Sequence, residues 1–266
     1  MSTFAIGGAT RLYAIVGDPI VQVKSPELYC TLFAAAGMNA VMVPAHVPAS
    51  QFDAVMPALM GLANLDGLLV TVPYKARAVG MADRLGPTAS CIGALNALRR
   101  DADGAWSGDM FDGAGFVCAA ERKGHVLQGR RVALFGAGGA GSAIGYELVA
   151  AGVESLDIID PQRQRAEALV DTLRRAFGDC RIASATSLPP TANMIVNAST
   201  VGMGGGDGLP GEIGDLDSAT LVGDVIVSQQ PTPLLRHAID HGCQTISGPE
   251  MLRGQSDALM SFFTRD

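Results

Sequence analysis

The segment from residue 132 to residue 148 constrains the fold most strongly, because it reads as a strand, a glycine turn and a helix. Its letters are V-A-L-F-G-A-G-G-A-G-S-A-I-G-Y-E-L. Gly136, Gly138 and Gly141 fit the pattern G-x-G-x-x-G. In that pattern the first glycine makes the tight turn, the second lets the backbone approach a pyrophosphate, and the third lets the helix pack closely on the strand. The segment therefore predicts a dinucleotide site, with phosphate at the N-terminus of the helix.

An acidic residue follows at the spacing that a ribose-binding carboxylate needs. The strand-like run S-L-D-I-I-D ends in Asp160, about 24 residues after Gly136. A carboxylate there accepts hydrogen bonds from the ribose hydroxyls and repels a 2′-phosphate, so Asp160 predicts NAD, with NADP less favoured. Asp160 can also act as a helix N-cap before Pro161. Arg163 and Arg165 lie close enough to serve a 2′-phosphate, which complicates the choice of cofactor.

Short β-rich runs alternate with helical patterns along the whole chain. The first half contains L-Y-A-I-V-G, then a helical pattern that Gly37 closes, then A-V-M-V-P-A and G-L-L-V-T-V. Ser25 and Pro26 indicate an N-cap followed by proline at the first helical position. Residues 120–130 are polar and glycine-punctuated and link two halves, and a second alternating series runs from residue 131 to about residue 246. This alternation predicts βαβ units and a mostly parallel sheet.

Composition excludes several classes of function. The chain has 266 residues and a net charge of -7, which argues against nucleic acid as a main partner. No apolar run approaches the roughly 20 residues of a membrane helix, and the first ten residues lack the features of a signal peptide. The five cysteines are dispersed without a C-x-x-C pair, as in reduced cytoplasmic proteins. The four histidines show no strong ligand spacing, so we expect no metal. Both a monomer and a homodimer fit the sequence.

Residues 67–75 read G-L-L-V-T-V-P-Y-K and raise a question about Lys75. The apolar run predicts a buried strand, and the lysine follows just beyond its end. Ligands of open α/β sheets bind outside the carboxyl ends of the strands. Lys75 is therefore either a solvated loop charge or a group directed at a substrate, and the residues by themselves leave both interpretations open.

Eight short motifs, in order, resemble those of one enzyme family. They are G-D-P-I-V-Q-V-K-S-P (17–26), V-T-V-P-Y-K (70–75), I-G-A-L-N-A-L (92–98), G-D-M-F-D-G-A-G-F (108–116), F-G-A-G-G-A-G (135–141), N-A-S-T-V-G-M (197–203), P-T-P-L-L (231–235) and G-P-E-M-L-R-G-Q (248–255). Over nearly its whole length the chain resembles the shikimate/quinate dehydrogenase family. The resemblance implies an α/β protein with a substrate domain over residues 1–112, completed by about 247–266, and a Rossmann domain over 113–246. It also implies that the last helix, from about Met251, returns to the substrate domain.

The resemblance further implies an NAD(P)-dependent dehydrogenase. Such an enzyme transfers hydride reversibly between nicotinamide and a secondary alcohol of a hydroxylated cyclohexane or cyclohexene. The family's catalytic pair corresponds here to Lys75 and Asp112. A lysine can remove the hydroxyl proton as hydride leaves, and its ammonium can return the proton during ketone reduction. Asp112 would orient Lys75 and hold the hydroxyl.

The remaining expected site residues follow from the same motifs. Ser25, Thr71, Asn96 and Gln255 match positions that bind the substrate, although each also has a structural interpretation as cap, turn or helix residue. The expected cofactor residues are Gly136, Gly138, Gly139, Ala140, Gly141, Asp160, Arg165, Asn197, Ala198, Thr200, Met203, Val225, Gly248 and Met251.

Several positions depart from the family's pattern. Val23 replaces the first of two serines that help to bind the substrate carboxylate, and Val227 replaces a tyrosine that often shares this role. Leu69 replaces an asparagine, and Met110 and Phe111 bring bulk beside Asp112. These changes favour a related cyclic polyol, with weak activity on shikimate itself. Binding of the carboxylate by Lys24 or by backbone amides is the equally weighted alternative. A catalytically weak NAD-binding regulatory homologue is a second class of function, and Asp160 disfavours an NADPH or quinone reductase.

Overall fold

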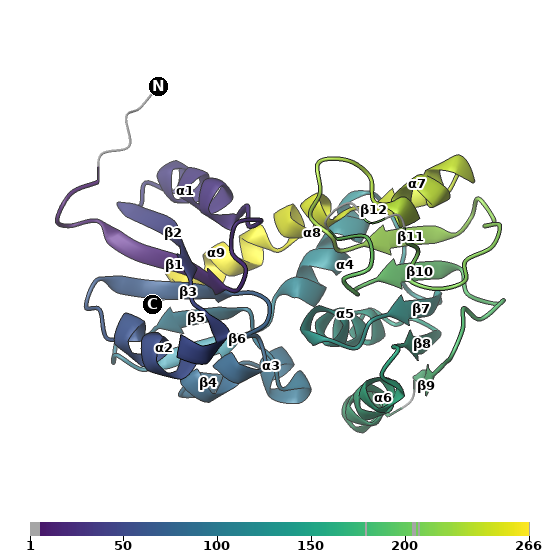
Figure 1. Cartoon of the computed structure of the whole chain (residues 1–266), viewed down its shortest axis with the longest axis horizontal. Helices are drawn as coiled ribbons and strands as arrows, with labels where there is room; N and C mark the ends of the chain where they lie inside the picture. The colour runs from purple at the N-terminus through teal and green to yellow at the C-terminus, as the bar shows by residue number, and fades with distance from the viewer. Residues whose placement is uncertain (1–5, 179, 204–205, 207, 266) are drawn as a thin grey trace. The chain divides into compact units, whose positions relative to one another are not determined.

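The computed structural model describes residues 6–178, 180–203, 206 and 208–265. The chain divides into two compact units, one formed by Met1–Met110 with Ala258–Asp266 and the other by Phe111–Asp257. Figure 1 shows the elements of both units. The division after Met110 lies close to residue 112, the boundary that the motifs suggest. The C-terminal return begins at Ala258, later than the expected residue 247.

The first unit contains a mixed sheet. Its strands among the described residues are β1 (Arg11–Gly17), β2 (Ala40–His46), β3 (Leu65–Val70), β4 (Arg84–Leu85), β5 (Ala97–Arg100) and β6 (Trp106–Asp109), in the order β2-β1-β3-β5-β6-β4. β1 pairs in parallel with β2 and β3, as the alternating pattern predicts. β5 runs antiparallel to both β3 and β6. The turn at Gly104, with φ +86°, makes the β5–β6 hairpin possible because two antiparallel strands need only a short connection.

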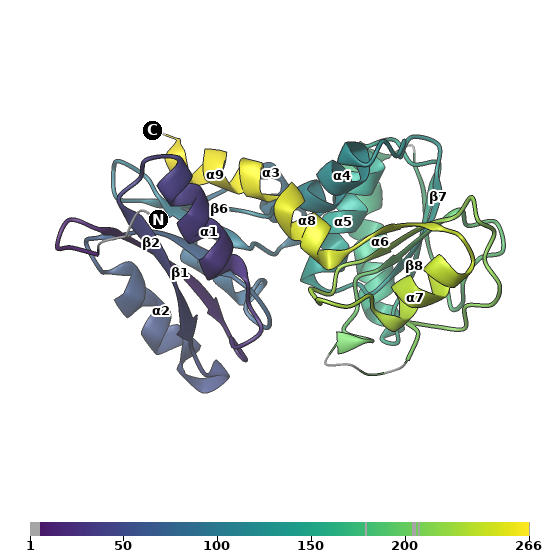
Figure 2. The same cartoon turned by 90° about the horizontal axis from the view of Figure 1, so that it is seen from above.

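Helices cover both faces of this sheet. They are α1 (Ser25–Ala35), α2 (Phe52–Met60), α3 (Pro87–Ile92) and the short turns η1 (Ala49–Gln51) and η2 (Arg77–Met81), joined by α9 (Ser256–Thr264). The ring of Tyr13 on β1 lies 4.6 Å from that of Phe33 on α1 and 5.1 Å from that of Phe263 on α9. Figure 2 shows α1 and α9 together on one side of β1, with α2 on the other.

Ser25 is not the N-cap of α1. The cap position belongs to Lys24, so Ser25 is already helical, and the cap makes no side-chain hydrogen bond. The helix ends near Gly37, whose φ of +68° is the left-handed conformation that glycine adopts most readily.

The second unit contains a parallel sheet with doubly wound topology. Its strands among the described residues are β7 (Arg131–Phe135), β8 (Ser155–Ile159), β9 (Arg181–Ser184), β10 (Met194–Asn197), β11 (Leu221–Asp224) and β12 (Gln244–Ile246). The order β12-β11-β10-β7-β8-β9 is the Rossmann order 3-2-1-4-5-6 read from β9. Strand order reverses between β7 and β10, which is where dinucleotides bind in this fold.

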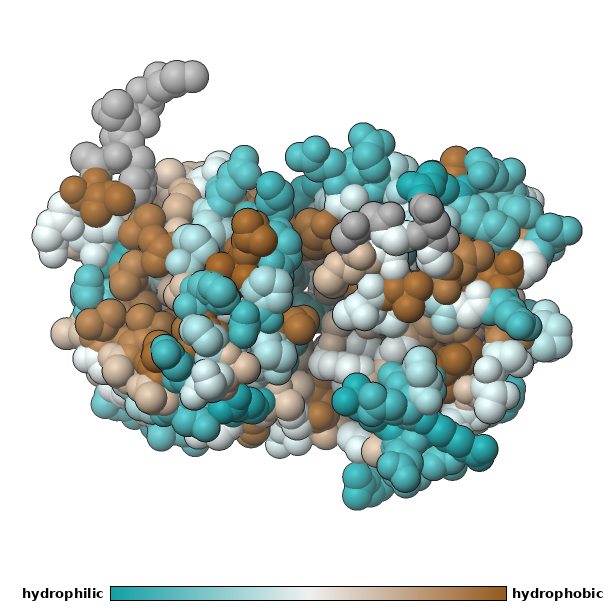
Figure 3. Space-filling model, viewed as in Figure 1, coloured by the Kyte–Doolittle hydropathy of each residue, from teal (hydrophilic) through white to brown (hydrophobic). Residues whose placement is uncertain are grey.

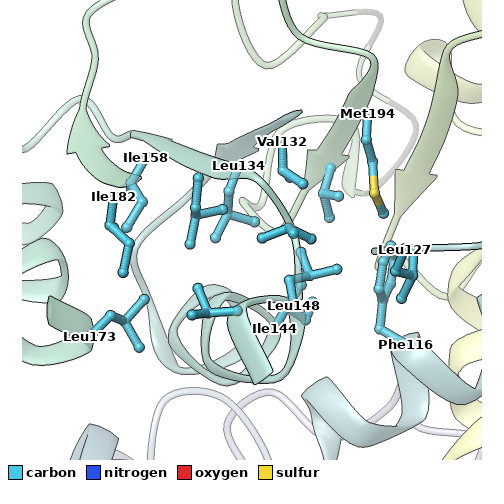
Figure 4. Close-up of a cluster of buried hydrophobic side chains, with 14 of the residues drawn as sticks. Phe116, Leu127, Val132, Leu134, Ile144, Leu148, Ile158, Leu173, Ile182 and Met194 are labelled. Atoms are coloured by element: carbon cyan, nitrogen blue, oxygen red, sulfur yellow. The ribbon is translucent and has the colours of Figure 1, made fainter. Parts of the chain in front are cut away.

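Alternating side chains divide the core of the second unit between the two faces of its sheet. Helices α4 (Asp112–Arg122), α5 (Gly139–Ala150), α6 (Arg163–Phe177) and α8 (Gly248–Gly254) contribute to one cluster, and α7 (Pro233–Asp240) contributes to the other. Val132 and Leu134 pack with Ile144 and Leu148 of α5, as Figure 4 shows. Ala133 and Phe135, at the alternate positions of β7, face α7 instead, because successive strand residues point to opposite faces.

The outer face of α6 is hydrophilic. Figure 3 shows polar surface over this helix, while Ala166, Leu169, Val170 and Leu173 on its inner face are buried. This amphipathic pattern is typical of a helix that covers one side of a sheet.

Close glycine packing holds α8 in the second unit. A Cβ atom added to Gly254 would lie 2.1 Å from the carbonyl oxygen of Gly115 on α4. The start of α8 is fixed by a capping box in which the Ser247 N–H and hydroxyl both donate to the carboxylate of Glu250. This packing explains why residues 248–257 belong to the second unit rather than to the C-terminal return.

We expect Gly254→Ala to destabilise the protein by about 1–3 kcal/mol, because its methyl group would meet backbone that cannot give way as a side chain can. Urea denaturation would measure the loss. Gly214→Ala is the matched control, because a Cβ atom there has nothing within 4 Å. Equal midpoints for the two variants would contradict the close packing of α4 and α8.

Candidate active site

Lys75 and Asn96 lie on adjoining segments at the carboxyl end of β3. The N–H of Val70, the last residue of β3, donates to the carbonyl oxygen of Asn96 at 2.8 Å. The N–H of Leu95 donates to the carbonyl oxygen of Lys75 at 2.9 Å. These contacts arise because β5 is antiparallel to β3, which places the residue before β5 beside the end of β3. Lys75 is half-buried, and Asn96 is only 5% exposed.

Thr71 and Ser25 belong to the same edge of the first sheet. The N–H of Thr71 donates to the carbonyl oxygen of Val16 at 2.9 Å. A Cβ atom on Gly17, the last residue of β1, would lie 2.5 Å from Cγ2 of Thr71, so the ends of β1 and β3 are in close contact. Ser25 is buried at the start of α1, after the loop that follows β1. Ser25 follows the end of β1, and Thr71 and Lys75 follow the end of its parallel neighbour β3. Asn96 directly precedes β5, which runs antiparallel to β3.

A histidine–aspartate contact that the motifs did not reveal anchors the loop after β1. The ring of His46, at the end of β2, lies 2.8 Å from the carboxylate of Asp18, which also accepts the N–H of Ala49 at 3.1 Å. The hydrogen bond with His46, followed by that from Ala49, lowers the pKa of Asp18. Asp18 directly follows β1, and His46 is the last residue of the adjoining strand β2. Their shared position at the carboxyl ends of paired strands is the sequence signal that could have predicted this contact.

The glycine turn of the second unit has the geometry that its pattern predicts. Gly136 has φ +98°, and a Cβ atom on Gly141 would lie 1.9 Å from the carbonyl oxygen of Gly136. A Cβ atom on Gly138 would have nothing within 4 Å. The positive φ explains the glycine at position 136, and close packing explains the one at position 141. Gly138 instead borders open space at the N-terminus of α5. That opening fits a dinucleotide pyrophosphate.

Asp160 is bound to the glycine turn. Its Oδ2 accepts the N–H of Ala137 at 2.8 Å, and its Oδ1 accepts the N–H of Gln162 at 2.8 Å. Asp160 is therefore not the N-cap of α6, because Gln162 occupies the cap position without a side-chain cap bond. Each carboxylate oxygen has a second lone pair, so Asp160 can still accept a hydrogen bond from a ribose hydroxyl. Arg163 pairs with Glu167 at 2.7 Å.

The loop after β10 meets the glycine turn where the strand order reverses. A Cβ atom on Gly136 would lie 2.8 Å from the backbone nitrogen of Ser199 and 2.9 Å from the carbonyl group of Ala198. Among the other expected cofactor residues, Gly139, Ala140, Ala198 and Val225 are half-buried, and Arg165, Thr200 and Met203 are exposed. Together these segments outline a surface at the switch point.

Three expected cofactor residues are deeply buried instead. Asn197 is 0% exposed, and its side-chain oxygen accepts the N–H and hydroxyl of Ser199. Met251 belongs to the hydrophobic core of the second unit. A Cβ atom on Gly248 would lie 2.3 Å from the carbonyl oxygen of Ile226, so this glycine serves close packing.

Asp112 and Gln255 are held by the glycines of the D-G-A-G motif. Asp112 begins α4 and is 4% exposed. A Cβ atom on Gly113 would lie 2.1 Å from the carbonyl oxygen of Ala143 on α5. A Cβ atom on Gly115 would lie 2.7 Å from Cβ of Gln255. The motif thus packs α4 on both α5 and the end of α8. Lys75 belongs to the first unit and Asp112 to the second, and their catalytic pairing stays a prediction.

The described parts of the chain contain neither a cluster of metal-binding side chains nor a membrane-spanning helix. Within those ranges, no three His, Cys, Asp or Glu side chains gather closely enough to hold a metal ion. The ring centroids of His237 and His241 lie 4.4 Å apart with the rings tilted by 49°, and His241 lies 3.4 Å from the carboxylate of Asp215. The hydrogen bond to the His237 carbonyl, followed by that to Asp215, raises the pKa of His241. None of the described helices has the length and apolar character needed to cross a membrane.

Comparisons with known proteins identify the family. A family model described as the shikimate dehydrogenase substrate binding domain matches residues 15–98. The shikimate dehydrogenase (NADP(+)) of Caulobacter vibrioides is 33% identical over 260 residues, covering 96% of this chain and 90% of its own. The chain belongs to the shikimate dehydrogenase family. The expected fold class, a substrate domain plus a Rossmann-type domain, is confirmed.

Two solved structures with similar folds are named for different substrates. Shikimate 5-dehydrogenase from Listeria monocytogenes, in complex with shikimate and NAD, is 27% identical, with a TM-score of 0.88 over 98% of this chain and 94% of its own. The 5-ketofructose reductase of a Gluconobacter strain is 25% identical, with a TM-score of 0.86 over 97% of this chain and 94% of its own. The names of these relatives include both NAD and NADP+. The family therefore uses NAD(P), and the names do not decide between the two cofactors for this chain.

In the glycine turn, we expect Gly138 to affect NAD+ binding and Gly141 to affect thermal stability. We expect Gly138→Ala to keep the melting temperature of the wild type but to weaken NAD+ binding at least tenfold, because its methyl group would enter the open space. We expect Gly141→Ala to lower the melting temperature, because its methyl group would overlap the Gly136 carbonyl. Calorimetric titration and thermal unfolding would measure both. Unchanged NAD+ affinity in Gly138→Ala would exclude this turn as the pyrophosphate site.

Proposed function

We propose that this protein is an NAD-dependent oxidoreductase that interconverts a secondary alcohol and a ketone on a small polyhydroxylated ring, with weak activity on shikimate. One observation carries the proposal: the glycine turn leaves open space beside Gly138 at the switch point of the Rossmann sheet. Lys75, just beyond the carboxyl end of β3, supplies the acid–base group that such a reaction needs.

The chemistry divides between proton and hydride. Bound nicotinamide accepts or supplies the hydride. Lys75 removes the proton of the substrate hydroxyl during oxidation and returns it during ketone reduction. Asp112, the second member of the catalytic pair that the family resemblance implies, accepts a hydrogen bond from the substrate hydroxyl. Ser25, Thr71, Asn96 and Gln255 bind the other ring substituents.

Asp160 supports NAD over NADP as the cofactor. Its carboxylate follows β8, as in dinucleotide sites that bind the ribose hydroxyls. The negative charge would repel a 2′-phosphate, and Arg163, which could neutralise one, is already paired with Glu167. The exposed Arg165 lies in the first turn of α6, where it is the cation that could still serve a 2′-phosphate.

Val23 and Val227 support a substrate that lacks the ring carboxylate of shikimate. A valine donates no hydrogen bond to a carboxylate, whereas a serine or tyrosine hydroxyl would donate one. Val23 is half-buried, and Val227 is 45% exposed. The name of the Gluconobacter relative, a 5-ketofructose reductase, supports a substrate other than shikimate for a chain with this fold.

The test is NAD+ reduction by the purified protein with shikimate, quinate and non-acidic cyclic polyols, together with NADH-dependent reduction of 5-ketofructose. We expect kcat/KM for shikimate to be at least tenfold below the value for the best non-acidic substrate. Lys75→Ala should reduce kcat for every substrate by about 100-fold or more, because it removes the general acid–base.

Lys24→Ala is the matched control. It should leave kcat for non-acidic substrates unchanged, whereas a rise in KM for shikimate and quinate alone would show that Lys24 binds the carboxylate. Turnover of shikimate as efficient as that of any polyol would contradict the proposed substrate class. NAD+ binding with no turnover in any of these assays would indicate a regulatory NAD-binding protein.

The choice of cofactor has its own test. We expect Asp160→Ser to lower the ratio of kcat/KM for NAD+ to kcat/KM for NADP+ by about tenfold, since it removes a charge that repels the 2′-phosphate. Asp171→Asn, which removes a charge from an exposed position further along α6, should leave the ratio within about twofold. A wild-type ratio in favour of NADP+ would overturn the NAD assignment.

A further inference from the structure

A buried carboxylate links the three segments of the second unit that border the switch point on the β10 side. Asp224, at the end of β11, is 1% exposed. Its Oδ2 accepts the hydroxyl of Thr232 at 2.7 Å and the side-chain N–H of Asn197 at 3.2 Å, and its Oδ1 accepts the N–H of Ile226 at 3.0 Å. The sequence motifs include Asn197 and Thr232, but they do not show that both residues converge on Asp224.

Each partner of Asp224 controls a different piece of backbone. Asn197 also donates to the carbonyl oxygen of Val201 at 3.1 Å and so closes the loop after β10. Thr232 is the N-cap of α7, and its hydroxyl accepts the N–H of Leu235. Ile226 directly precedes Val227 in the segment that follows β11. The Asp224 carboxylate therefore holds the loop 197–203, the segment 225–227 and the start of α7 together.

The segments held in this way carry exposed apolar side chains. Val201, Met203 and Val227 are 38%, 53% and 45% exposed, although the backbone beneath them is anchored in the core. The loop 197–203 also contacts the glycine turn through Ser199 and Gly136. Buried anchoring below exposed apolar groups is what a preorganised ligand surface requires, because it limits the ordering that binding must impose.

We propose that Asp224, with Asn197 and Thr232, is a positioning group that holds the loop 197–203 in the shape that binds the nicotinamide half of the dinucleotide. This inference rests on the proposed function. Asn197 acts through the backbone that it shapes, since its own side chain is fully buried. Asp224 touches neither substrate nor cofactor in this proposal.

Asp224→Asn tests the role with almost no change in shape. An asparagine has one acceptor oxygen in place of two, so at least one of the N–H donors from Asn197 and Ile226 must lose its acceptor. We expect the Kd for NAD+ to rise about tenfold or more, measured by calorimetry on the purified protein at a temperature where it is folded. We also expect kcat to fall, while KM for the polyol changes less than KM for NAD+.

Asp157→Asn is the matched control for loss of a buried carboxylate. Asp157 lies on β8 of the same sheet, is 7% exposed and faces Arg181 at 3.6 Å, away from the loop 197–203. We expect this variant to lose stability but to keep the Kd for NAD+ within about twofold of the wild type. Equal losses of NAD+ affinity in both variants would overturn the positioning role, because they would show a general effect of stability.

Thr232 provides a second test if Asp224→Asn does not fold. Thr232→Val removes the hydroxyl that Asp224 accepts, whereas Thr232→Ser keeps it. We expect Thr232→Val to weaken NAD+ binding about threefold or more and Thr232→Ser to bind as the wild type does. Wild-type affinity in Thr232→Val would overturn the inference. A wild-type protein that bound no NAD+ would overturn the proposed function, and the inference with it.

Discussion

Three pairs of backbone segments in the second unit approach one another more closely than any side chain would permit. Gly141 meets the carbonyl of Gly136, Gly113 meets that of Ala143, and Gly254 meets that of Gly115. Glycine alone allows these contacts, since a Cβ atom would lie between 1.9 and 2.1 Å from a carbonyl oxygen in each case. The contacts set the glycine turn on its strand, α4 on α5 and α8 on α4. The positions of Asp112 and Gln255 depend on them.

The first unit positions its residues through strand ends rather than through glycine packing. The parallel strands β1 and β3 deliver the loops that carry Ser25 and Thr71 to one edge, and β3 also leads to Lys75. Asn96 reaches that edge because β5 runs the other way. Mixed strand directions therefore gather groups from segments far apart in the chain. The Asp18–His46 pair ties the first of these loops to the end of β2.

The residues of the candidate site favour a dehydrogenase whose substrate lacks a carboxylate. The residues proposed for proton transfer and for binding ring hydroxyls are present, whereas Val23 and Val227 stand where the family's motifs imply carboxylate-binding side chains. The buried network around Asp224 holds the backbone beside Val227 and the start of α7. Under the proposed function, a different side chain at the exposed Val227 would alter substrate recognition without disturbing the Asp224 carboxylate.

The sequence by itself determined the strand–turn–helix at residues 132–148, the alternation of strands and helices, and the family. These features are local, since a glycine turn and a hydrophobic period are written in consecutive residues. Tertiary structure decided that β5 is antiparallel, that α8 packs on α4, and that Asn197 faces Asp224 rather than solvent. Such outcomes depend on pairing between residues distant in the chain, and each buried polar group takes the partner that the packed core brings to it. A local sequence pattern does not specify a partner that is distant in the chain. The hydrogen bonds of Asp224 with Asn197 and Thr232 were therefore found only in the folded protein.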